Sequence, residues 1–141
     1  MEIGIKLLSV EAKKPHKSTS QSLGWDLYSA ETKIIEAQSS SIIRTDISIQ
    51  FADNIYGEIW GRSGLAKNHG ITIGAGLIDT DFMGNIKVCI FNHAQIPYQV
   101  QQGDRVAQLV FKQATPVTLR VIGHIRATER GQKGFGSSGI K

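Results

Sequence analysis

The chain has 141 residues, 40% of them hydrophobic and 20% charged, which fits one globular domain and requires no second. Its apolar runs are far too short to cross a membrane, its first residues lack the apolar core of a secretion signal, and its single cysteine, Cys89, excludes an internal disulfide framework. The formal charge of +4 is mild and the basic residues are scattered, so a polyphosphate ligand explains them as well as a nucleic acid does. We therefore expect a protein that remains where it is made, in the cytoplasm or nucleus, or in those of a host cell if the source is a virus.

Short strand patterns follow one another along the chain, with no amphipathic helix of useful length between them. Residues 47–51 and 86–90 alternate apolar and polar side chains, and residues 106–111 form the continuous apolar run of a buried strand. Turn residues separate the strands at the intervals expected of a sandwich or barrel. The one helical piece, Ser63 to Lys67, spans a turn or two, and residues 13–22 are typical of a polar surface loop. The sequence therefore predicts an all-β domain.

Four glycine-containing segments stand out against this background because they carry charged or polar side chains. Each segment alone is explained by turn chemistry, since aspartates cap turns and glycines adopt positive φ angles. Taken together they favour a ligand site. They are residues 24–30, 61–66, 74–84 and 103–109.

Two of these segments offer specific chemistry. Arg62 and Ser63 place a bidentate phosphate donor and a hydroxyl where a strand gives way to a short helical turn, which suits an anion. Asp79 lies in an apolar, glycine-rich hairpin, where burial can turn a carboxylate into a base for water. Cys89 is not a convincing alternative as a catalytic nucleophile, because it has no histidine partner within sequence reach.

The C-terminal stretch from Arg130 to Gly139 combines glycines with one arginine, one aromatic ring and two hydroxyls. Glycines let a chain approach a ligand closely, arginine and hydroxyls suit phosphate oxygens, and an aromatic ring stacks on a base. The plainer alternative is a Gly/Ser tail without a ligand. Residues 134–139 also match G-x-G-x-x-G, but the helix and the acidic residue about 20 positions further on, which a dinucleotide site needs, do not follow in this sequence. We predict a core of residues 1–128 and an arm of residues 129–141 that closes over the site.

These five segments, in this order from Gly24 to Gly139, closely resemble the five motifs of the homotrimeric deoxyuridine triphosphate nucleotidohydrolases, the dUTPases. The resemblance implies a jelly-roll-like (β-clip) subunit, three of which surround a three-fold axis with active sites at their interfaces. It also implies Mg²⁺-assisted water attack on the α-phosphate of dUTP, which yields dUMP and pyrophosphate. Such an enzyme limits uracil incorporation into DNA and supplies dUMP for dTMP synthesis, and it needs neither nucleic acid nor membrane as a partner.

The resemblance also implies residue roles. Asp79 would be the general base for the attacking water, and Asp26 would meet Mg²⁺ through water, which suits an ion that keeps several of its waters. The main chain of the 75–77 hairpin would read uracil, and Phe82 would lie against the deoxyribose. The phosphates and the base would be held from the core and from a neighbour's arm. The implied substrate-binding residues are Arg62, Ser63, Gly64, Ala75, Gly76, Leu77, Phe82, Gln108, Arg130, Phe135, Gly136, Ser137 and Ser138.

The sequence departs from the family pattern at four positions without losing a catalytic group. Phe82 stands where the family usually has tyrosine, Gly61 where proline is usual, Lys133 where glycine is usual and Ser138 where threonine is common. Of these, only Phe82 touches specificity.

Two alternatives stay open from the sequence. The related dCTP deaminases share the fold, but they use a glutamate and a differently spaced arginine-serine motif, whereas this chain has Asp79 and Arg62-Ser63-Gly64. A catalytically retired binding protein is the other alternative, and the intact catalytic positions argue against it.

Overall fold

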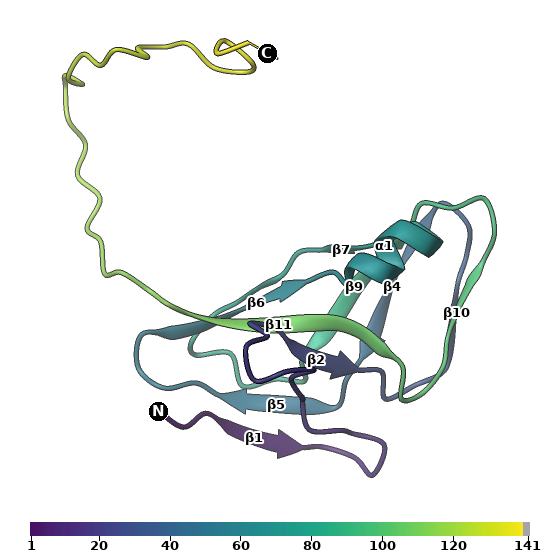
Figure 1. The fold of residues 1–141 in the computed structure, drawn as a ribbon. Helices are drawn as coiled ribbons and strands as arrows, with labels where there is room; N and C mark the ends of the chain where they lie inside the picture. The colour runs from purple at the N-terminus through teal and green to yellow at the C-terminus, as the bar shows by residue number, and fades with distance from the viewer. Residues whose placement is uncertain (140–141) are drawn as a thin grey trace.

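A computed structural model describes residues 1–139, and nearly all regular secondary structure in this part of the chain is β-strand (Figure 1). The all-β prediction is confirmed. The helix starts at the predicted Ser63 and extends to His69, where Gly70 ends it in a left-handed conformation with φ of 65°. The elements are β1 (Gly4–Leu7), β2 (Trp25–Tyr28), β3 (Lys33–Ile35), β4 (Ser39–Arg44), β5 (Ile47–Gln50), β6 (Ile55–Trp60), α1 (Ser63–His69), β7 (Ile71–Gly74), β8 (Leu77–Ile78), β9 (Lys87–Asn92), β10 (Tyr98–Val100) and β11 (Arg105–Gln113).

Two larger antiparallel sheets, in the orders β2-β11-β6-β8 and β4-β9-β7, enclose the core, and the pairs β1-β5 and β10-β3 complete it. Alternation along the strands produces the core, because successive residues face opposite sides of a sheet. In β9, for example, Val88 and Ile90 are buried while Lys87 and Phe91 are exposed. The core is built mainly from isoleucine, leucine and valine, which suit a packed β interior.

The hairpin expected around Asp79 has no hydrogen-bonded ladder between its two strands. β8 pairs with β6, whereas the next strand, β9, pairs with β4 and β7. The chain therefore passes from one sheet to the other through residues 79–86. The two strands separate there because each is held by partners far away in the sequence, and a cleft opens between them.

The compact part of the described chain ends at Ala114, whose N–H donates to the carbonyl of Asn54 at 2.7 Å. From Pro116 to Gly139 every residue is exposed, and this segment runs far from the sheets (Figure 1). Residues 116–128, which the sequence places in the core domain, are exposed in this subunit. Within residues 1–139, no helix is long and apolar enough to cross a membrane.

Candidate active site

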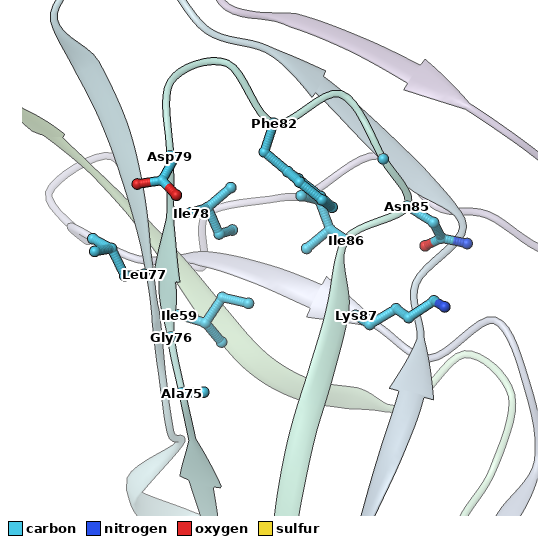
Figure 2. Close-up of a pocket in the computed structure, with 11 residues that line it drawn as sticks. Ile59, Ala75, Gly76, Leu77, Ile78, Asp79, Phe82, Asn85, Ile86 and Lys87 are labelled. Atoms are coloured by element: carbon cyan, nitrogen blue, oxygen red, sulfur yellow. The ribbon is translucent and has the colours of Figure 1, made fainter.

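The cleft between β8 and β9 has a volume of about 440 Å³ and contains Asp79 (Figure 2). Ala75, Gly76, Leu77 and Phe82 line it as well, so the structure gathers this predicted group in one place. Ile59 from β6 also contributes, together with Asn85, Ile86 and Lys87 from the far side of the cleft. The sequence did not single out these four, because apolar and polar residues at strand ends carry no distinctive pattern.

Close contact with β6 explains why a glycine stands at position 76. The Ile59 N–H donates to the Gly76 carbonyl at 2.8 Å, and a Cβ at position 76 would lie only 2.4 Å from the Ile59 carbonyl oxygen. The preceding Ala75 has φ of 47°, in the left-handed region. The main chain that lines the cleft is therefore held in one tight conformation against the sheet.

Asp79 begins the loop that follows β8. The Phe82 N–H donates to the Asp79 carbonyl at 3.1 Å, and the Thr80 hydroxyl donates to the Ile55 carbonyl at 3.0 Å, so the loop is anchored beside Asp79. The Asp79 side chain is exposed in the isolated subunit. The burial expected from its apolar surroundings is therefore not provided by this subunit alone, because the cleft is open on that side.

A second, smaller cavity of about 190 Å³ gathers Asp26, Arg62, Ser63, Gly64 and Gln108. Arg62 precedes α1 at the end of β6, and its Nε lies 3.3 Å from Asp26 Oδ1. The Gln108 amide donates to the Gly61 carbonyl at 2.8 Å, which fixes its position on β11. We call this group the arginine cradle.

Two residues that the sequence did not assign complete the cradle. Arg105 Nη1 donates to Asp26 Oδ2 at 3.2 Å, and the Ser18 hydroxyl donates to the same oxygen at 3.3 Å. Arg105 lay within a segment already singled out, so its charge was a usable signal. Ser18 comes from a polar loop in which no pattern distinguishes one serine from the next.

The two cavities share no lining residue, and the arm reaches neither of them. Phe135 is fully exposed, and the other predicted arm residues, Arg130, Gly136, Ser137 and Ser138, are exposed as well. One subunit thus has two separate cavities, the Asp79 cleft and the arginine cradle, which we call the two half-sites because each gathers part of the predicted site residues. Among residues 1–139 no three His, Cys, Asp or Glu side chains are grouped so that they could hold a metal ion.

Comparison with known proteins assigns the chain to a family. The dUTPase family model matches residues 10–139. A deoxyuridine 5'-triphosphate nucleotidohydrolase of Fowlpox virus is 43% identical over 143 residues and is matched over 99% of both chains. The enzyme of that name from Candida albicans is 43% identical over 137 residues, covering 96% of this chain and 86% of its own.

Solved structures agree in fold. The dUTPase of Staphylococcus bacteriophage 80alpha with dUpNHpp superposes with a TM-score of 0.92 at 28% identity, over 99% of both chains. A variant dUTPase of phage phi11 of S. aureus, whose structure is described as revealing the coordination of a structural Mg(II) ion, has a TM-score of 0.83 at 26% identity, over 88% of this chain and 98% of its own. The jelly-roll-like fold is thereby confirmed. The chain belongs to the dUTPase family, the nucleotidohydrolases of deoxyuridine 5'-triphosphate.

Proposed function

We propose that uracil and deoxyribose occupy the Asp79 cleft, that the triphosphate lies on an arginine cradle, and that water attacks the α-phosphate to release dUMP and pyrophosphate. The observation that carries this proposal is the cleft itself, where a carboxylate and a rigid stretch of main chain face one cavity of about 440 Å³. A nucleoside fits a cavity of that size. Asp79 takes the proton from the attacking water, a task for which a positioned carboxylate is suited.

Base recognition in this proposal depends on the main chain from Ala75 to Leu77. The contact of Gly76 with Ile59 holds this segment in one backbone conformation, so its N–H and C=O groups present a fixed pattern of donors and acceptors. A fixed pattern of donors and acceptors distinguishes uracil from cytosine, because the wrong base leaves buried polar groups without partners. In this proposal the same main-chain segment also leaves no room for a 5-methyl group.

The residues around Asp26 fit Mg²⁺ bound through water and do not fit direct ligation. Contacts from Arg62, Arg105 and Ser18 use three of the roughly four lone-pair sites of a carboxylate, which leaves room for about one water. The two guanidinium groups also offset the negative charge that a directly bound cation needs. Bound with the triphosphate, Mg²⁺ neutralises phosphate charge, while Arg62, Ser63, Gly64 and Gln108 orient the phosphate oxygens.

A trimer joins the half-sites in this proposal. The described arm makes no contact that would hold it on its own sheets, and its residues Val117, Leu119 and Val121 expose 77%, 94% and 100% of their surface. Alternating exposed apolar residues are typical of a strand that lies against a partner. An arm packed on a neighbour brings Arg130, Phe135, Gly136, Ser137 and Ser138 to the triphosphate and the base there.

The activity is tested with the purified chain, Mg²⁺ and either dUTP, UTP or dCTP. We expect dUMP and pyrophosphate from dUTP. UTP and dCTP should be hydrolysed to their monophosphates and pyrophosphate much more slowly than dUTP. Ammonia released from dCTP would favour a deaminase, and binding of dUTP without turnover would favour a retired enzyme. We further propose that the enzyme limits dUTP and supplies dUMP in the cytoplasm or nucleus, a location that staining of cells expressing the tagged chain tests.

A further inference from the structure

Asp46 is a buried carboxylate outside both half-sites. It lies in the turn between β4 and β5 and exposes 3% of its surface. Its oxygens accept hydrogen bonds from the Ser9 hydroxyl at 2.8 Å, from Arg44 Nη1 at 2.8 and 3.0 Å, and from Asn85 Nδ2 at 2.7 Å. A carboxylate with this many partners holds the groups around it firmly.

The bond with Asn85 is reciprocal and connects Asp46 to the Asp79 cleft. The Asp46 N–H donates to Asn85 Oδ1 at 3.1 Å, while Asn85 Nδ2 donates to Asp46 Oδ1. Figure 2 shows the Asn85 amide directed away from Asp79, although Asn85 itself lines the cleft. Asp46 has φ of 53°, a left-handed conformation that Asp and Asn tolerate better than most residues. An aspartate at position 46 thus suits both the left-handed turn and the reciprocal hydrogen bonds with Asn85.

The loop across the mouth of the cleft is anchored at its two ends by different groups. Thr80 holds the end beside Asp79 through the Ile55 carbonyl, and Asp46 holds the far end through Asn85. The Ser48 hydroxyl adds a bond to the Met83 carbonyl at 2.7 Å. Phe82 lies between the anchors, with its ring over Gly84, where a Cβ would come within 2.7 Å of the ring. The position of the far end therefore decides where the Phe82 ring and the wall opposite Asp79 stand.

We propose that Asp46 is a positioning residue that sets the affinity for the nucleoside by holding Asn85 and, through the loop, Phe82. Asp46 does not touch the substrate. This inference rests on the proposed function in placing uracil and deoxyribose in the Asp79 cleft. The two ends of the loop have different roles in this inference. The Thr80 end positions Asp79, and the end held by Asp46 positions the wall of the cleft that the nucleoside contacts.

The variant Asp46→Asn tests this role. Asparagine keeps the left-handed turn and the shape, but its NH₂ group replaces one of the two oxygens to which Ser9, Arg44 and Asn85 donate in the parent. We expect KM for dUTP and Kd for dUpNHpp to rise about tenfold with kcat within about twofold, because a misplaced wall weakens binding while the Thr80 anchor keeps Asp79 in place. The matched control is Ser9→Ala, which removes a donor from the other side of Asp46 and should keep the parental KM.

Hydrogen exchange gives a readout that does not need turnover. Without nucleotide, amides of residues 81–85 should exchange faster in Asp46→Asn than in the parent and in Ser9→Ala. If Asp46→Asn does not fold, Asn85→Ala removes the same reciprocal pair from the other side and should give the same shifts. An unchanged exchange rate, an equal KM rise in Ser9→Ala, or a fall in kcat at constant KM would each overturn the inference. Failure of the parent to hydrolyse dUTP would instead overturn the proposed function, and the two failures are thus distinguishable.

Discussion

Asp79 is the residue on which the proposed chemistry depends, and its exposure in one subunit means that substrate, arm or neighbour must exclude water from it. We expect Asp79→Asn to lower kcat by about 10²–10⁴, the usual loss when a general base is removed. Binding of dUpNHpp should persist, because the amide keeps the shape of the side chain. Asp81→Asn, two positions further along the same exposed loop, is the control, and parental rates in Asp79→Asn would place the base elsewhere.

Phe82 should distinguish deoxyribose from ribose by its ring face. Admitting UTP would bury a 2′-hydroxyl against an aromatic surface at a cost of roughly 1–3 kcal/mol, or about ten- to hundred-fold in rate. We expect Phe82→Tyr to keep the preference for dUTP over UTP and Phe82→Ala to erode it. The measurement is kcat/KM for both nucleotides in the three proteins. If Phe82→Ala discriminated between dUTP and UTP as well as the parent does, sugar selection would depend on the main chain around Gly76 and not on the Phe82 ring.

Asp46 should also contribute to acid sensitivity. Burial raises the pKa of its carboxyl. Hydrogen bonds from Asn85 and Ser9 and the charge of Arg44 lower the pKa by more, so that it lies below the usual 3.8. The unfolded chain then binds the proton first, so this stabilisation is complete above about pH 5 and is lost as pH falls through the folded-state pKa.

We therefore expect Tm to fall less steeply between about pH 5 and pH 3 in Asp46→Asn than in the parent. The pKa of Glu31 is also lowered, because its bonds with Arg44 outweigh the effect of burial. Glu31 should therefore leave some dependence of Tm on pH in the variant. Thermal unfolding monitored by circular dichroism provides the measurement. Parallel curves for the two proteins would show that the Asp46 interactions do not couple stability to pH.

At the scale of elements, the arm and the sheets are separate parts of the described chain. Every strand ends by Gln113, and the glycine-rich segment contributes nothing to the core. Deleting residues 129–141 should therefore leave Tm and the oligomeric state unchanged and lower kcat/KM for dUTP by roughly a hundredfold, since groups that bind the triphosphate are lost. Lys133→Gly, which restores the usual family residue, is the control and should behave as the parent. Full activity after the deletion would leave the arm as a tail without a ligand.

At the scale of the whole molecule, the proposed trimer combines the Asp79 cleft of one subunit with the arm of another. Coexpressing Asp79→Asn with the 129–141 deletion should produce mixed trimers in which some sites combine an intact Asp79 with an intact arm from another subunit. Random mixing of equal amounts predicts about a quarter of the parental activity, although each variant alone is nearly inactive. The mixture of separately purified trimers is the control. An arm that served its own subunit would produce no recovery.

Much of this molecule was predictable from the sequence, because the relevant information is local. Alternating apolar residues predicted the strands that became β5 and β9, a continuous apolar run predicted β11, and the Ser63 segment predicted α1. The grouping of Ala75, Gly76, Leu77, Asp79 and Phe82 around one cleft follows from their closeness in the chain. The order of the five motifs indicates the family from the sequence alone, since order and spacing together are rarely met by chance.

Only the tertiary structure decided features that depend on residues far apart in the chain. Asp46 and Asn85 are joined across 39 positions by hydrogen bonds that no pattern in the sequence announces. The expected hairpin opened into a cleft because β8 and β9 found partners in different sheets, and residues 116–128 are exposed because no strand follows β11 within residues 1–139. The sequence by itself determined which chemical groups are present and which local conformations they favour. Their distances, their burial and the separation into two half-sites came from long-range pairing, which depends on the packing of the whole chain.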